Sequence, residues 1–266
     1  MTTQYQGPIK LIVLDVGGCV VDGPQDLSDT YAEDDGIGVK APVIALDETL
    51  QDWGIDLSWE QIREPMGLYK KDHLRELLTT EEARRQFEAA HGREWREGDL
   101  EEMFASFSEL QTEVIVREEL ARPIRGARET IETLRGYGKL ISNTTGYTEN
   151  AAEALYAKLV EDHGISFDFK THSDAVPAGR PGPWMIQQGM RELSIQETDA
   201  VIKVGDTTKD IEAGLNAGVW TVGVYSTGND GFDHLRDAGA DYLIPSIREL
   251  PEVVWEVENR MARGEH

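Results

Sequence analysis

The sequence predicts an α/β fold in which an α-helical cap domain interrupts a doubly wound, mainly parallel core sheet. Three observations support this prediction. A short run of branched apolar residues at 11–14 fits a strand covered on both faces. Residues 41–120 show helical periodicity and no convincing strand. After Arg122-Pro123, short apolar segments alternate with amphipathic helices, which is typical of a parallel, Rossmann-like sheet.

The elements are expected in the following order. The first strand ends at Asp15, and after Asp22 the pair Gly23-Pro24 breaks the element. Residues 25–40 are polar, acidic and aperiodic, which predicts a loop. We assign 24–120 to the inserted cap domain, and 1–23 with 121–266 to the core. The core should hold about six strands, the later five at 140–142, 167–169, 200–206, 219–224 and 241–244, with helices at 126–137, 148–159, 184–193 and 209–217.

Composition restricts the partners and the compartment. The net charge of −24 comes from 50 acidic and 26 basic residues and argues against nucleic acid and anionic membranes as partners. Only nine of the basic residues are Lys, a pattern that fits a protein adapted to high salt. The single Cys19, the absence of an apolar run of ~20 residues and a start without signal-peptide features together predict a cytoplasmic protein.

Polar groups follow several of the predicted strands. Asp15, the Ser142–Thr144 group, and Asp206 with Asp210 all come where a strand ends, and parallel strands bring such ends to one edge. Taken singly, each carboxylate could merely cap a turn. Three carboxylates near a phosphate would repel it unless a hard cation such as Mg²⁺ lay between them. Arg180, on a turn bracketed by prolines, could neutralise phosphate oxygens.

These strand-end residues resemble the four motifs of the haloacid dehalogenase superfamily, in which the first Asp attacks and the last acidic residues hold Mg²⁺. The segments 65–73, 144–148, 177–181 and 203–207 are similar to its phosphonatase branch, the phosphonoacetaldehyde hydrolases. This resemblance implies a phosphonate substrate, a Mg²⁺ cofactor and, as an open expectation, a homodimer. It implies catalytic roles for Asp15, Lys70 and His73, substrate or phosphate binding by Met66, Gly67, Ser142, Thr144, Tyr147 and Arg180, and a metal site at Asp15, Gly17, Asp206 and Asp210.

Two features can be interpreted from the residues themselves. Most phosphatases of the superfamily place an acid two residues after the nucleophile, and Gly17 occupies that position here. Residues three or four apart share a helix face, so Lys70, His73 and Met66 should point the same way, and Lys71 elsewhere. Beside an imidazole and under an apolar cap, the pKa of Lys70 could fall enough to expose a free amine. Otherwise Lys70 would be an exposed lysine and His73 a packing residue.

The chemistry that fits both features is cleavage of a C–P bond. An imine between Lys70 and an aldehyde accepts the carbon electrons when Asp15 attacks phosphorus, and no alkoxide has to be protonated. We therefore expect Mg²⁺-dependent hydrolysis of phosphonoacetaldehyde, or a close phosphonoaldehyde, to acetaldehyde and phosphate. The alternatives are a small-molecule phosphomonoesterase of the same superfamily, in which Lys70 only binds an anion, and a protein that binds a phosphorylated metabolite without turnover.

Three departures from the family pattern concern the substrate. Gly17-Gly18-Cys19-Val20 replaces the usual Ala-Gly-Thr-Thr after the nucleophile, and Asn143 stands where the family often has Ser. The acidic residues 26–35 look longer than their family equivalent and would form either a lid or a solvated surface. None of these departures removes a residue that the mechanism needs, but they allow a different phosphonoaldehyde.

Overall fold

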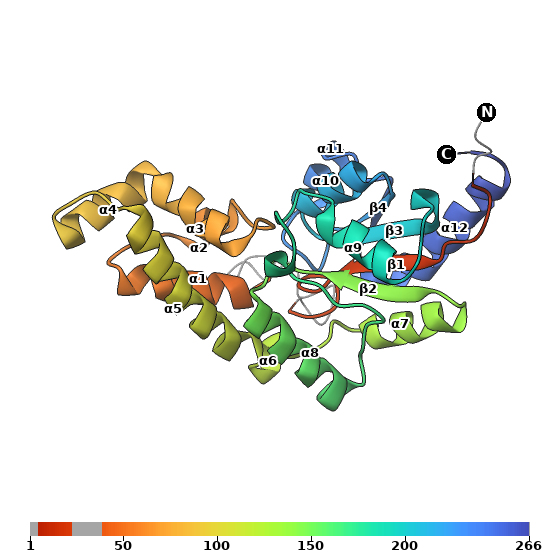
Figure 1. The fold of residues 1–266 in the computed structure, drawn as a ribbon, viewed down its shortest axis with the longest axis horizontal. Coiled ribbons are helices and arrows are strands. Elements are labelled where there is room, and N and C mark those ends of the chain that lie inside the picture. Colours follow the sequence, from red (N-terminus) through yellow and green to blue (C-terminus); the bar gives the residue numbers. More distant parts are fainter. Residues whose placement is uncertain (1–4, 23–38, 266) are drawn as a thin grey trace.

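A computed structural model describes residues 5–22 and 39–265. Within these ranges the core is a five-stranded, fully parallel sheet in the order β2-β1-β3-β4-β5 (Figure 1). The predicted α/β class and parallel sheet are therefore confirmed. The strands are β1 (Leu11–Asp15), β2 (Leu140–Thr144), β3 (Val201–Gly205), β4 (Trp220–Val224) and β5 (Tyr242–Ile244).

Helices cover both faces of the sheet, as a doubly wound fold requires. Side chains alternate along a strand, so β1 sends Leu11 and Val13 to the face packed by α9 and α10, while Ile12 and Leu14 join the main core on the other face. All four side chains are fully buried. The core helices are α7 (Ala127–Gly136), α8 (Glu149–His163), α9 (Trp184–Glu192), α10 (Thr208–Ala217), α11 (Phe232–Asp237) and α12 (Leu250–Ala262).

The predicted strand at 167–169 does not form. Phe169 makes only an isolated bridge with Ser142 of β2. Two main-chain hydrogen bonds form there, from the Asp168 N–H to the Ile141 carbonyl at 2.7 Å and from the Asn143 N–H to the Phe169 carbonyl at 3.3 Å. Next to them side chains take part: the Asp168 carboxylate accepts from the Ile141 N–H at 2.8 Å, and the Asn143 amide donates to the Thr171 carbonyl at 3.0 Å. The described sheet consequently has five strands instead of six.

A helical insertion separates β1 from β2, as expected. It contains α1 (Ala41–Asp52), α2 (Trp59–Arg63), α3 (Lys70–Thr79), α4 (Glu81–His91), α5 (Glu97–Ile115) and α6 (Glu118–Ala121). Helices α1 to α5 extend to one end of the molecule, opposite the two ends of the chain, and α6 lies beside α8 (Figure 1). The long helix α5 packs on α1 and also on α8 of the core. There Gln111 accepts hydrogen bonds from the Thr148 N–H and hydroxyl at 3.1 and 3.2 Å.

Two further expectations concern the acidic segment and membrane spans. The acidic segment at 26–35, interpreted above as a lid or a solvated surface, lies outside them. Among the residues that are described, no helix combines the length and apolar character needed to cross a membrane.

Candidate active site

Three buried carboxylates meet at the carboxyl edge of the sheet. Asp15 is the last residue of β1, Asp206 follows β3, and Asp210 lies in the first turn of α10. Oxygen atoms of the three lie within 4.8 Å of one another. The parallel register produces this meeting, since it also sets Asp15 beside Thr144 at the end of β2.

Two buried cations contact this cluster. The Arg180 guanidinium forms ion pairs with Asp15, at 3.0 Å, and with Asp210. Lys203, in the middle of β3, reaches Asp210 at 2.8 Å and donates to the Thr144 hydroxyl at 2.8 Å. Lys203 was not among the predicted site residues. The sequence signal that could have revealed Lys203 is a single charged residue within an apolar strand, and the structure shows that this strand is fully buried.

The two cations do not compensate the three carboxylates equally. Burial, opposed by Arg180, raises the pKa of Asp15, and burial together with Asp15 holds the pKa of Asp206 well above its usual range. Although burial raises the pKa of Asp210 too, Arg180 and Lys203 outweigh it and bring that pKa below its ordinary value. The protein's own cations therefore compensate Asp210 and leave Asp15 and Asp206 short of positive charge.

Asp15 and Asp206 each have one carboxylate oxygen without a hydrogen-bond partner among the described residues. These atoms, Asp15 Oδ1 and Asp206 Oδ1, are buried. A buried carboxylate oxygen without a partner is costly, and a hard cation satisfies it. The Asp15, Asp206 and Asp210 cluster therefore fits a metal ion. Gly17 could join it only through its backbone carbonyl.

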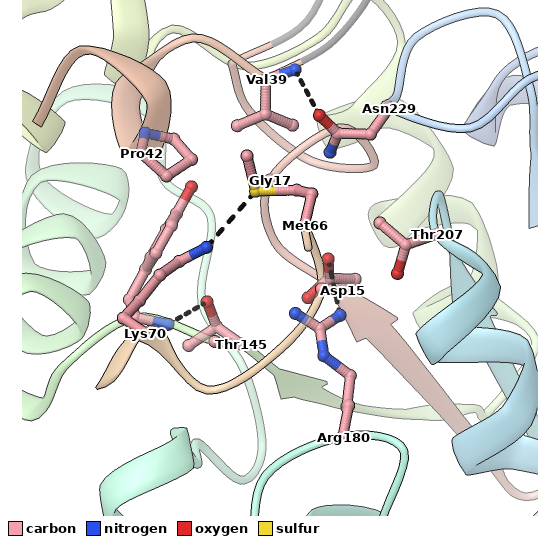
Figure 2. Close-up of a pocket in the computed structure, with 13 residues that line it drawn as sticks. Asp15, Gly17, Val39, Pro42, Met66, Lys70, Thr145, Arg180, Thr207 and Asn229 are labelled. Carbon is pink, nitrogen blue, oxygen red and sulfur yellow. Dashed lines mark hydrogen bonds and ion pairs between the residues drawn. The ribbon is translucent and has the colours of Figure 1, made fainter. Parts of the chain in front are cut away.

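The insertion brings Lys70 to this edge of the sheet. Lys70 begins α3 and is 3% exposed, and its Nζ approaches the Met66 sulfur at 3.3 Å (Figure 2). The interpretation of Lys70 as an exposed lysine is therefore wrong. Burial, followed by the charge of Arg180, lowers the pKa of Lys70 from 10.5 to about 7, against the opposing effect of Asp15. Lys71 instead pairs with Glu101 on the surface.

His73 lies one turn further along the same face and is fully buried. Its Nε2 is 2.7 Å from the Ile62 carbonyl, and because a carbonyl can only accept, the proton belongs on Nε2. Nδ1 is buried without a partner among the described residues. Burial, with Lys70 as the next cause, keeps the pKa of His73 well below its usual value, so the ring is neutral.

A narrow cleft of about 20 Å³ lies between the insertion and the sheet edge. That volume holds roughly one water molecule. Of the predicted site residues, it is lined by Asp15, Gly17, Met66, Gly67, Lys70, Tyr147 and Arg180 (Figure 2). Further lining residues, which were not predicted, are Val39, Pro42, Thr145, Gly146, Thr207 and Asn229.

Two predicted phosphate-binding residues lie outside this lining. The Thr144 hydroxyl bonds Lys203 beneath the cleft. The Ser142 hydroxyl is buried against Gly189 of α9, where a Cβ would be 3.2 Å from it. From this part of the chain, the residues at the cleft are Thr145, Gly146 and Tyr147.

The insertion touches the core closely at Gly67. This residue has φ +94°, and a Cβ there would lie 2.8 Å from the Thr207 hydroxyl. Any larger residue would be strained in this conformation and would also push Thr207 away. Glycine thus allows the segment before α3 to lie against the loop after β3.

The space beside Gly17 is filled by Tyr147. A Cβ at position 17 would lie 2.8 Å from the Tyr147 hydroxyl and 3.2 Å from a Val39 methyl. The Tyr147 hydroxyl is itself buried and has no partner in the described part of the chain. An acidic side chain at position 17 would not fit here without displacing Tyr147.

Comparisons with known proteins agree with this geometry. A family model described as haloacid dehalogenase-like hydrolase matches residues 9–218. Phosphonoacetaldehyde hydrolase from Nitratidesulfovibrio vulgaris is 30% identical over an alignment that covers 99% of this chain and 96% of the relative. The protein of the same name from Parabacteroides distasonis is 35% identical, over 78% of this chain and 86% of its own.

A solved structure supports the same assignment. The phosphonoacetaldehyde hydrolase-like protein from Oleispira antarctica superposes with a TM-score of 0.88 at 28% identity, covering 100% of this chain and 98% of its own. The chain belongs to the haloacid dehalogenase-like hydrolases, and among them it is a phosphonoacetaldehyde hydrolase-like enzyme.

Proposed function

We propose that this enzyme hydrolyses the C–P bond of phosphonoacetaldehyde, or of a close phosphonoaldehyde, in a Mg²⁺-dependent reaction that passes through a Lys70 imine and an Asp15 aspartyl phosphate. One observation carries the proposal. Lys70, a buried amine with a pKa of about 7, lines the same cleft as Asp15. The names of the relatives support the substrate class.

Lys70 is suited to imine formation because a large share of it is uncharged near neutral pH. Lys70 Nζ contacts the thioether sulfur of Met66, which is a weak acceptor and does little to hold a proton on the amine. The neutral amine attacks the aldehyde carbon, and a proton moves from nitrogen to oxygen to give a carbinolamine. Its hydroxyl takes up a proton from solvent and leaves as water when the C–O bond breaks, and the hydrogen that stays on nitrogen makes the product a protonated imine. The free Nδ1 of His73 can pass the proton from nitrogen to the carbinol oxygen and become neutral again, because Nε2–H is fixed on the Ile62 carbonyl.

Asp15 then attacks phosphorus. The electron pair of the C–P bond moves into the imine and forms an enamine, and the phosphoryl group is transferred to the Asp15 carboxylate. Arg180, already paired with Asp15 at 3.0 Å, is placed to bind phosphoryl oxygens. Asp15, Asp206 and Asp210 would hold Mg²⁺, which supplies the positive charge that lets a carboxylate approach an anionic phosphonate.

The remaining steps need only water and proton transfer. The enamine takes up a proton on carbon, and hydrolysis of the resulting imine releases acetaldehyde and regenerates Lys70. Water hydrolyses the aspartyl phosphate to phosphate and regenerates Asp15. No step protonates an alkoxide, which agrees with a glycine at position 17.

We also propose that the helical insertion acts as a cap that opens and closes. A cleft of about 20 Å³ cannot hold a phosphonoaldehyde, so substrate has to enter while Met66, Gly67 and Lys70 are further from the sheet edge. Closure then brings the amine to the nucleophile and excludes bulk water.

Borohydride trapping tests the imine directly. With phosphonoacetaldehyde and borohydride, the peptide that contains Lys70 should gain the mass of the reduced adduct. Lys70→Arg keeps the positive charge but cannot form an imine, so labelling and C–P cleavage should both be lost. Lys71→Arg is the matched control and should still be labelled at Lys70. Turnover without any adduct, or an adduct on another lysine, would refute the assignment.

The same Lys70→Arg variant separates this function from a phosphomonoesterase. If Lys70 only binds an anion, arginine should preserve much of the ester hydrolysis. For the wild type we expect kcat/KM on phosphonoacetaldehyde to exceed that on simple phosphate esters by at least ~10²-fold, the scale of a missing general acid. Comparable wild-type values on both substrates would favour the phosphomonoesterase.

A further inference from the structure

Asn229, in the segment after β4, makes contacts in two directions. Its backbone N–H and its side-chain Nδ2 both donate to Asp206 Oδ2, each at 2.8 Å. Its Oδ1 accepts from the Val39 N–H at 3.3 Å, the contact drawn in Figure 2. One amide side chain thus joins a carboxylate of the candidate metal site to the chain just before α1.

On the metal side, Asn229 determines which oxygen of Asp206 is available. Two hydrogen bonds from Asn229 engage Oδ2, whereas Oδ1 is buried and has no partner among the described residues. The surrounding segment is anchored as well: the Thr227 hydroxyl donates to the Gly18 carbonyl at 2.6 Å, and the Asp230 N–H to the Asp206 carbonyl at 3.0 Å. Asp206 is therefore held with one oxygen free for a cation.

On the other side, Val39 marks the start of the insertion. It lies two residues before α1, is 3% exposed and lines the cleft. Nearby, the Asp22 carboxylate accepts from the N–H of Ala41, the first residue of α1, at 2.7 Å. A movement of α1 away from the sheet edge would draw the Val39 N–H away from Asn229.

We propose that Asn229 is a positioning residue that couples cation binding at Asp206 to the position of the insertion. The inference rests on the metal site and the moving cap of the proposed function. Asparagine suits this task because its amide offers a donor for Asp206 and an acceptor for Val39 at the same time. When a cation fixes Asp206, Asn229 is fixed with it and the Val39 contact is favoured. By linkage, the closed insertion favours cation binding to the same degree.

The first measurement is the Kd of Mg²⁺ by isothermal titration calorimetry, without substrate. Asn229→Ala should raise this Kd by ~10-fold or more, the usual effect of removing a group that orients a metal ligand. Val39→Pro deletes the donating N–H on the insertion side and should also raise the Kd, although it leaves Asn229 and Asp206 intact. Val39→Ala shortens the same side chain but keeps that N–H, so it should raise the Kd less than Val39→Pro does.

The second measurement is hydrogen exchange of the peptide that contains Val39, with and without Mg²⁺. Mg²⁺ should slow exchange of this peptide in the wild type and have no such effect in Asn229→Ala. A purely structural role for Asn229 would lower the melting temperature but would not make exchange at Val39 insensitive to Mg²⁺.

The outcomes are distinguishable from failure of the proposed function. A wild type that binds no Mg²⁺ would overturn the metal site and this inference together. A wild type that binds Mg²⁺, with an unchanged Kd in Asn229→Ala, would overturn the inference alone. So would Mg²⁺-dependent exchange at Val39 that persists in Asn229→Ala.

Discussion

Replacing Lys70 by Met should make the protein more stable while it abolishes C–P cleavage. The amine is 3% exposed, and burial is the main cause that lowers its pKa from 10.5 to about 7. The unfolded chain keeps the ordinary pKa. Between pH 7 and 10.5 the unfolded state therefore binds a proton that the folded state does not. The stability that Lys70→Met gains, because no charge is buried at this position, is therefore largest at low pH and disappears as the pH rises.

The magnitude follows from the two pKa values. One pH unit corresponds to 1.36 kcal/mol, so the buried amine costs up to ~4 kcal/mol at pH 7 and ~2 kcal/mol at pH 9. Methionine has a similar length, is apolar and titrates at neither pH. We expect Lys70→Met to raise the free energy of unfolding by up to these amounts, which places Lys70 among residues kept for activity at the expense of stability.

Urea unfolding at pH 7 and pH 9, at one fixed salt concentration, measures the effect. Lys71→Met is the matched control, because Lys71 pairs with Glu101 at the surface and should change stability by ~0.5 kcal/mol or less. A Lys70→Met protein less stable than wild type at pH 7, or a gain that is the same at both pH values, would refute the reasoning. Lys70 would then not be a destabilised, readily deprotonated amine.

Two further predictions concern the nucleophile and the surface. Asp15→Asn should abolish phosphate release while the circular dichroism spectrum stays native, because an amide is not a competent nucleophile; full activity in a preparation shown by mass to be free of deamidation would contradict the role. Thermal stability should rise with KCl from low to molar concentration, because salt screens the repulsion behind a net charge of −24. A flat or falling melting temperature would indicate an ordinary acidic protein.

The convergence of the carboxylates could be predicted because a parallel sheet fixes it. Strands that run the same way end at one edge, so Asp15 and Asp206 had to be neighbours once both strands were recognised. Helical spacing similarly placed Lys70 and His73 on one face. It could not show that this face is buried, because burial depends on how the insertion packs against the sheet.

Other features depend on contacts that leave no local pattern. The segment 167–169 is apolar enough for a strand, but it makes a single bridge with β2, and side chains of Asp168 and Asn143 supply the neighbouring hydrogen bonds. Asn229 contacts Val39 across 190 positions of sequence, and no periodicity connects them. Lys203 was visible as a charge in an apolar strand, yet only the fold identifies Asp210 and Thr144 as its partners.

The groups around Gly17 support the proposed preference for a carbon leaving group over an alkoxide. A phosphatase needs a proton donor close to the leaving oxygen, and the place of the usual acid is filled here by the Tyr147 hydroxyl. Burial, with nearby Asp22 and Asp15, holds the pKa of Tyr147 well above its ordinary value, so this hydroxyl can donate a hydrogen bond but gives up its proton reluctantly. Lys70, which lines the same cleft, changes charge near neutral pH, and its useful form is the free amine. A cleft that contains a weakly acidic Tyr147 hydroxyl and an easily deprotonated Lys70 amine is better matched to imine chemistry than to ester hydrolysis.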